Sequence, residues 1–187
     1  MQAIEADDDE LMARYVSGDA AAFDALYGRY KDRTWRYFLR QLGEERARDA
    51  QQDAWLKIVD RRAQYRPQGR FAAYLFSVAR SVLVDAQRKT MTLVEQTLDT
   101  DELPAAGAGE PRRAARLERL AAAISAALGR LPIDQRDAFV MQQEAGLSYA
   151  DIATATGASV ETVKSRLRYA RGKLADALAQ EMHDVEF

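Results

Sequence analysis

The chain has no cysteine and one histidine, His183, among its 187 residues. Without cysteine there are no disulfide bonds, thiolate nucleophiles or cysteine-ligated zinc sites. A single histidine cannot form a histidine metal cluster or a catalytic triad, and the carboxylate, lysine and hydroxyl groups show no arrangement typical of an active site. We therefore predict a protein that is not an enzyme, with no metal, no cofactor and no small-molecule substrate.

Long apolar runs are missing as well. No apolar stretch of the sequence is long enough to cross a bilayer. The acidic segment Met1–Glu10 lacks the basic stretch and apolar core of a signal peptide. We expect a cytoplasmic protein without membrane insertion, and we interpret this acidic segment and the tail Glu181–Phe187 as frayed ends.

The chain also lacks the basic excess usual in DNA-binding proteins, since its formal net charge is -2 and its pI about 5.6. The charges are unevenly distributed, however. Acidic residues gather in Glu5–Glu10 and Asp99–Glu102, and basic residues gather in Arg61–Arg70 and Lys164–Lys173. Such local patches can contact both phosphate and a basic protein partner.

Apolar residues recur with helical spacing along most of the chain, and no stretch alternates with period two. Before residue 90, four stripes predict four amphipathic helices that share one core: Phe23–Tyr30, Trp35–Leu42, Ala54–Val59 and Phe71–Val82. Leu103–Pro111 is rich in Pro, Gly and Ala, as linkers are. A second helical block follows, in which Asp134 is placed to cap a helix. The sequence predicts an all-α protein with two small helical domains, residues 1–91 and 113–187, joined by a flexible linker at 92–112.

The segment Leu147–Arg171 has the spacing of a helix-turn-helix. Ser148 and Asp151 form a capping box for its first helix. Gly157 stands where the chain must turn, often with a positive φ that glycine adopts cheaply. Val163 should point from the second helix into the angle between the two helices.

The second helix of this motif begins at a capping serine and runs from Val160 to about Met182. Recognition helices read base edges from their N-terminal, outward side. The residues placed there are Ser159, Glu161, Thr162, Ser165 and Arg166, whereas Lys164, Arg168 and Arg171 suit the phosphate backbone. The alternative is a solvated basic helix without a DNA contact.

The first domain contains a basic loop, Arg61–Arg70, with an aromatic residue inside it. Basic groups interleaved with aromatic rings suit single-stranded nucleic acid. The candidate contacts are Tyr65, Arg66, Arg70, Tyr74, Arg80 and Arg88. On this segment alone, a surface loop before a core helix is the favoured interpretation.

Together these segments resemble an extracytoplasmic-function sigma factor of bacterial RNA polymerase, in the sigma-70 family. The resemblance extends from Asp9 to Leu178 and is most specific in the second domain. Ala47–Val59 resembles the family's polymerase-binding helix, and Phe71–Arg80 its promoter-melting helix. Leu131–Phe139, Leu147–Ala153 and Val160–Arg166 resemble the domain that reads the upstream promoter element.

This resemblance implies that the protein directs core polymerase to promoters. The first domain would dock on a coiled coil of the largest polymerase subunit and capture the −10 element as an unpaired strand. The second would read the duplex −35 element. The partners would be promoter DNA, the β and β′ subunits of core polymerase and, in many relatives, an anti-sigma protein. The implied polymerase-binding residues are Asp49, Gln52, Asp53 and Leu56.

Two other interpretations remain open from the residues themselves. The first is a conventional helix-turn-helix regulator with an N-terminal helical regulatory domain. The second is a helical protein-interaction module without a DNA function, which would suit the acidic net charge. The segment Asp49–Val59 separates the first from a sigma factor, because a conventional regulator needs no polymerase-docking helix.

Overall fold

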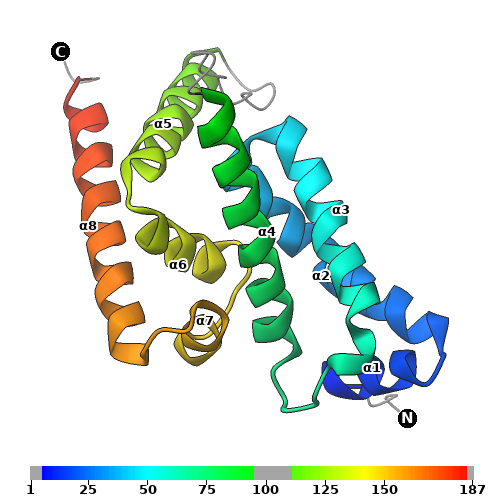
Figure 1. The fold of residues 1–187 in the computed structure, drawn as a ribbon. Helices are drawn as coiled ribbons and strands as arrows, with labels where there is room; N and C mark the ends of the chain where they lie inside the picture. Colours follow the sequence, from blue (N-terminus) through cyan, green and yellow to red (C-terminus); the bar gives the residue numbers. More distant parts are fainter. Residues whose placement is uncertain (1–5, 95–110, 185–187) are drawn as a thin grey trace, which may run out of the picture.

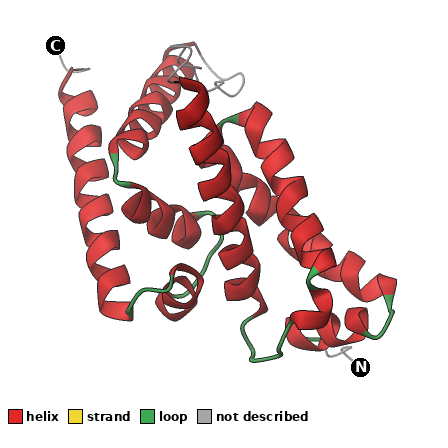
Figure 2. Ribbon diagram, viewed as in Figure 1, coloured by secondary structure: helices red, strands yellow, loops and turns green. Residues whose placement is uncertain are grey.

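The computed structural model describes residues 6–94 and 111–184, and all of their regular structure is helical (Figures 1 and 2). The prediction of an all-α protein with two helical domains is confirmed. The first domain contains α1 (Asp8–Val16), α2 (Ala20–Leu42), α3 (Glu44–Asp60), the 3-10 turn η1 (Arg62–Gln64) and α4 (Phe71–Val94). The second contains α5 (Pro111–Arg130), α6 (Ile133–Gln143), α7 (Tyr149–Thr156) and α8 (Val160–Asp184).

The linker predicted at 92–112 falls mostly outside the described residues. Its first three residues continue α4, its last two begin α5, and 95–110 are not described. Among the described residues, no helix combines the length and the apolar character that a membrane span requires.

Two of the four predicted helices in the first domain are a single helix. The stripes Phe23–Tyr30 and Trp35–Leu42 both lie in α2, which begins at the capping residue Asp19 and ends at Gly43. The Asp19 side chain accepts hydrogen bonds from the backbone N–H groups of Ala21 and Ala22. No proline or glycine lies between the two stripes, and the helix continues through them.

The interpretation of the acidic N-terminus as a frayed end is wrong for its last residues, because Asp8–Glu10 form the first turn of α1. Asp7 caps this helix by accepting a hydrogen bond from the Glu10 backbone N–H at 2.7 Å. Residues 1–5 lie outside the described part. At the other end, α8 extends to Asp184, and residues 185–187 are not described.

Helix α4 lies in the middle of the molecule, with α2 and α3 on one side and α6 and α7 on the other (Figure 1). Its buried residues Phe71, Leu75 and Phe76 belong to an apolar core that continues from the first domain into the second. A smaller cluster, centred on Leu128 and Leu174, joins α5 to α8. The two domains therefore pack directly against each other through α4.

Candidate nucleic-acid and polymerase interfaces

The helix-turn-helix has the local geometry that its sequence predicts. Ser148 accepts a hydrogen bond from the backbone N–H of Asp151 at 3.1 Å, which caps α7. Gly157 ends α7 in the left-handed region with φ of 67°. Val163 of α8 is fully buried, as is Ile152 of α7, so the two helices meet through apolar side chains.

The importance of this corner can be measured with two valines of the same helix. Val163 is 0 % exposed, whereas Val160 is 38 % exposed. We expect Val163→Ala to lower the free energy of unfolding by about 2 kcal/mol, because it leaves a cavity in a packed core. Val160→Ala should change it by less than about 0.5 kcal/mol. Urea denaturation followed by circular dichroism tests this, and equal effects of the two variants would contradict the buried corner.

The N-terminal part of α8 faces solvent. Ser159 caps the helix by accepting a hydrogen bond from the Thr162 N–H at 3.1 Å. Most of the predicted DNA-contacting residues of this helix are exposed: Ser159, Glu161, Thr162, Lys164, Ser165, Arg168 and Arg171. Lys164 forms an ion pair with Glu161 at 2.7 Å, and Arg171 donates to the Gln142 side chain at 2.7 Å.

Arg166 is the exception on this helix. It is half-buried, and its guanidinium group pairs with Asp134 of α6 at 2.6 Å. The prediction that Asp134 caps α6 is wrong. Pro132 occupies the cap position, and Asp134 lies in the first turn, where its carboxylate binds arginines.

The basic loop and the start of α4 form a pocket with a volume of about 260 Å³. Its wall includes Tyr65 and Tyr74, whose ring centroids are 5.0 Å apart. Burial raises the pKa of both phenols. Arg66 and Arg70 are exposed at the pocket. The remaining lining residues are Gln64, Gln68, Ala73, Ser77 and Thr154.

One wall of this pocket comes from the second domain. Thr154 of α7 accepts a hydrogen bond from Arg70 at 2.9 Å, so α7 lies at the rim. The other two arginines of the first domain that are predicted to bind DNA, Arg80 and Arg88, do not line the pocket. Arg88 is exposed near the end of α4, and Arg80 is half-buried.

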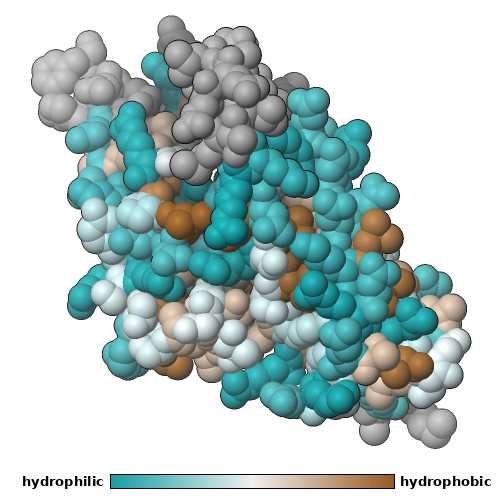
Figure 3. All heavy atoms as spheres, viewed as in Figure 1, coloured by the Kyte–Doolittle hydropathy of each residue, from teal (hydrophilic) through white to brown (hydrophobic). Residues whose placement is uncertain are grey.

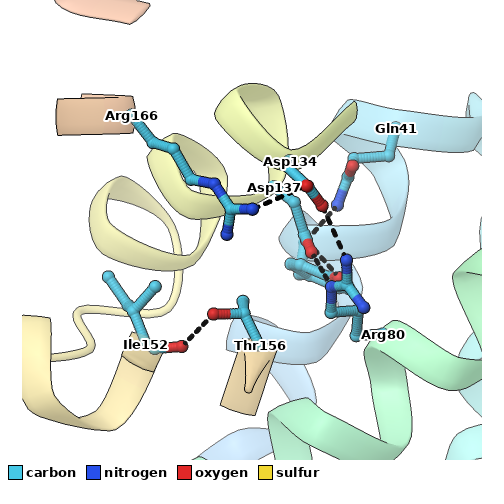
Figure 4. Close-up of polar contacts among 8 residues, drawn as sticks. Gln41, Arg80, Asp134, Asp137, Ile152, Thr156 and Arg166 are labelled. Carbon is cyan, nitrogen blue, oxygen red and sulfur yellow. Dashed lines mark hydrogen bonds and ion pairs between the residues drawn. The ribbon is translucent and has the colours of Figure 1, made fainter. Parts of the chain in front are cut away.

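Arg80 is the centre of an ionic network between the domains (Figure 4). Its guanidinium group binds Asp137 at 2.7 Å and Asp134 at 2.8 Å, both from α6. Tyr37 of α2 donates a hydrogen bond to Asp137 at 2.6 Å. Asp137 is 1 % exposed. Burial raises its pKa, an effect that Tyr37 and Arg80 oppose, and burial beside Asp137 holds the pKa of Tyr37 well above its usual value.

A second set of contacts between the domains lies at the end of α6. Glu144 pairs with Arg40 at 2.8 Å and with Arg36 at 3.3 Å, both from α2. Arg33 donates to the backbone carbonyl of Ala145. Charge-assisted bonds thus hold the two domains together along the length of α6.

The predicted polymerase-docking residues share one exposed face of α3. Asp49, Gln52, Asp53 and Leu56 follow the i, i+3, i+4, i+7 spacing of a helix face, and all four are exposed. Leu56 is 51 % exposed. The visible surface in Figure 3 is mostly hydrophilic, with small separate hydrophobic patches. A leucine among carboxylates on such a surface suits contact with a basic partner that has apolar side chains.

Comparison with known proteins identifies the family of the chain. The family model described as Sigma-70 region 2 matches residues 26–92, and the one described as Sigma-70, region 4 matches residues 121–174. The ECF RNA polymerase sigma factor SigM of Mycobacterium tuberculosis is 35 % identical over 175 residues, covering 93 % of this chain and 86 % of SigM. The ECF sigma factor EcfG of Rhodopseudomonas palustris is 34 % identical over 135 residues, covering 72 % of each chain.

The chain belongs to the ECF RNA polymerase sigma factors.

Two solved structures have a similar fold. CnrH in complex with the cytosolic domain of CnrY has a TM-score of 0.71 and 26 % identity, covering 92 % of this chain and 97 % of CnrH. The sigma factor RpoE of Bartonella quintana, in complex with the anti-sigma factor NepR, has a TM-score of 0.70 and 22 % identity, covering 84 % of this chain and 96 % of RpoE.

As a sigma factor, the protein directs core RNA polymerase to promoters, and its partners are the core enzyme and promoter DNA. This identity disfavours a conventional helix-turn-helix regulator. The region 2 match contains α3 and every residue lining the pocket except Thr154, and the region 4 match contains Thr154 and the helix-turn-helix.

Several residues that join parts of this sigma factor were not predicted from the sequence: Asp9, Tyr37, Asp137, Glu144 and Thr154. One of them had a readable signal. Asp137 precedes the buried residues Val140 and Met141 by three and four positions, which places its carboxylate on the buried face of α6. An acid on such a face needs a partner, and Arg80 on the mostly apolar α4 supplies one.

Proposed function

We propose that this sigma factor divides promoter recognition between its two domains, taken as residues 1–91 and 113–187. The first takes the −10 element as an unpaired strand at the pocket between the basic loop and α4. The second reads the −35 element as duplex with the N-terminal part of α8. The single observation that carries the proposal is the pocket itself, because basic and aromatic side chains converge there on one hollow.

The pocket has the chemistry that an extruded base requires. The Tyr74 ring offers a stacking surface, and Arg66 and Arg70 offer positive charge to neighbouring phosphates. Gln68 and Ser77 add groups that can hydrogen-bond a base edge. Extrusion costs a few kcal/mol per base, which these contacts offset. Arg80 and Arg88 lie further along α4 and suit phosphates of the strand beyond the extruded base.

In the second domain, the residues divide by their place on α8. Glu161, Thr162, Ser165 and Arg166 take the base edges, and Ser159 at the helix N-terminus takes a phosphate. The longer basic side chains Lys164, Arg168 and Arg171 bind the backbone.

Docking on core polymerase falls to the exposed face of α3. Asp49 and Asp53 oppose a basic surface of the largest polymerase subunit, Gln52 hydrogen-bonds it, and Leu56 packs against its apolar side chains.

The arrangement of the two domains supports a further part of the proposal, which is that the free protein binds promoters poorly. Asp134 and Asp137 of the second domain hold Arg80, and Thr154 of the same domain holds Arg70. Two arginines assigned to the −10 strand are thereby paired with the other domain. Core polymerase separates the domains and fixes their spacing, which makes the second DNA contact effectively intramolecular.

The similar proteins suggest how this sigma factor is controlled. The similar proteins CnrH and RpoE were solved in complexes, the latter with the anti-sigma factor NepR. An anti-sigma protein that inserts between the domains would compete with core polymerase, which also binds the chain with its domains apart. We further propose that the protein acts in the cytoplasm, where its polymerase is, and that it catalyses no reaction itself.

The pocket assignment is tested by Arg66→Ala in the complex with core polymerase. The substrate is a fork-junction DNA whose −10 element is unpaired. We expect binding to weaken by about tenfold and the logarithmic salt slope to fall by about one, because one phosphate contact is lost. Arg14→Ala, an exposed arginine of α1 paired with Asp19, is the matched control and should bind as the wild type does. An unchanged salt slope for Arg66→Ala would contradict the assignment.

A further inference from the structure

We infer that Asp9 is a positioning residue for promoter selectivity, which it exerts by fixing the shape of the loop that forms the base pocket. The inference rests on the proposed function of that pocket. Asp9 lies in the first turn of α1, within a segment whose charge suggests only solvent exposure, and it contacts no DNA in this account.

The Asp9 carboxylate holds the loop at two points. One oxygen accepts a hydrogen bond from the Tyr65 hydroxyl, and the other accepts one from the backbone N–H of Gly69. Between these two points lie Arg66, Pro67 and Gln68. A single side chain therefore spans the segment of the loop that supplies two of the residues lining the pocket.

The two anchor points are themselves specific. The Tyr65 side chain is 8 % exposed, and its ring lies 5.9 Å from that of Phe71 and 5.0 Å from that of Tyr74. Gly69 has φ of 67°, a conformation that other residues adopt at a cost. These contacts fix the conformation of the loop between Tyr65 and Gly69, and that conformation sets where Arg66 and Gln68 lie.

Helix α1 is in turn fixed to the domain by the neighbouring carboxylate. Asp8 pairs with Arg29 of α2 at 2.7 Å and accepts a hydrogen bond from Tyr30. Leu11 and Met12 of α1 are buried in the core. Asp9 therefore acts from a rigid support, which is what a positioning group needs.

A purely structural role for Asp9 predicts something different. The side chain that caps α1 is Asp7, so loss of Asp9 removes no helix cap. If Asp9 only stabilised the domain, its loss would weaken binding to every promoter equally. If it positions the loop, its loss reduces the discrimination between bases at the pocket. Discrimination is therefore the quantity to measure.

The test compares variants of the full chain in complex with core polymerase. Fork-junction DNAs share one −35 element and carry each of the four bases in turn at the unpaired −10 positions. The readout is the ratio of dissociation constants between the worst and the best base. We expect Asp9→Asn, which replaces charge-assisted hydrogen bonds by neutral ones, and Tyr65→Phe, which removes one hydrogen bond, each to lower this ratio about fivefold. Affinity for core polymerase and for −35 duplex should be unchanged.

Two controls separate positioning from general effects. Glu10→Gln makes the same change of charge on the next residue, whose side chain is exposed, and should keep the wild-type ratio. Asp7→Ala removes the cap of α1 and should lower the melting temperature while the ratio stays unchanged. If Asp9→Asn fails to fold, Tyr65→Phe still carries the test, because it retains the ring in the core.

The possible results distinguish the base pocket from the positioning role of Asp9. If Asp7→Ala lowers the ratio as much as Asp9→Asn does, the effect is helix stability and the inference is overturned. If Asp9→Asn and Tyr65→Phe keep the ratio while Arg66→Ala weakens binding, the pocket stands and the positioning role falls. If the wild type binds all four bases equally and Arg66→Ala has no effect, the proposed pocket and this inference fall together.

Discussion

Reversing the charge of Asp49 and Asp53 together, as Asp49→Lys with Asp53→Lys, should reduce promoter-specific transcription by core polymerase about 100-fold or more. Both carboxylates lie on the exposed face of α3, so the substitutions leave the core intact. Placing two lysines against a basic partner surface replaces two attractions with two repulsions, each costing several kcal/mol when the interface excludes water. Abortive and run-off transcription with purified core enzyme measures the loss directly.

The matched control makes the same total change of charge elsewhere. Glu44→Lys with Asp176→Lys reverses two exposed acids. Glu44 is turned by roughly 140° from Asp49 around α3, and Asp176 is in the second domain. This control should transcribe nearly as the wild type does. Equal loss in both double variants would mean that net charge, and not the face of α3, governs docking.

The second large effect is expected at Asp137. We predict that Asp137→Asn raises the affinity of the free protein for single-stranded −10 DNA by about tenfold or more. Asp137 is 1 % exposed and holds Arg80 and Tyr37 together, so an amide there leaves Arg80 with the partly exposed Asp134 as its remaining counter-charge. Weakening a buried charge-assisted contact in this way costs about 1–3 kcal/mol. That cost falls on the closed arrangement, in which the two domains pack against each other through α4. The fraction of molecules that can bind DNA rises accordingly.

Fluorescence anisotropy with single-stranded −10 DNA measures the affinity, and small-angle scattering of the free protein measures the separation of the two domains. Asp176→Asn, the same substitution at an exposed position of α8, should change neither. In complex with core polymerase, Asp137→Asn and the wild type should bind promoters with similar affinity, because the domains are already apart. A free Asp137→Asn protein with wild-type dimensions and wild-type affinity for the single strand would refute the masking of Arg70 and Arg80.

Local features of this fold could be predicted because short-range chemistry determines them. The helix-turn-helix follows from Ser148, Gly157, Ser159 and Val163, which cap, turn or close the two helices within a few residues of each other. Likewise, the face of α3 follows from spacing alone. These features depend on contacts between residues close in sequence, where helical periodicity is a sufficient guide.

The closed arrangement could not be predicted in this way. Asp137 and Arg80 are 57 residues apart in sequence, and neither has a local feature that names the other. The same holds for Asp9 and Gly69, which are 60 residues apart. Charge near a chain end usually indicates solvent, and only the tertiary contact with the loop shows otherwise. The expected cap at Asp134 was wrong for a related reason, because distant arginines bind its carboxylate instead.

We propose that promoter recognition belongs to the complex with core polymerase and is divided between two domains. Run-off transcription on a library with a randomised promoter region tests this proposal. We expect the selected templates to share two short sequence blocks at a fixed spacing, and we expect neither block to be selected when core polymerase is omitted and the free protein is used to capture DNA. Recovery of one block, bound tightly as duplex by the protein alone, would contradict it.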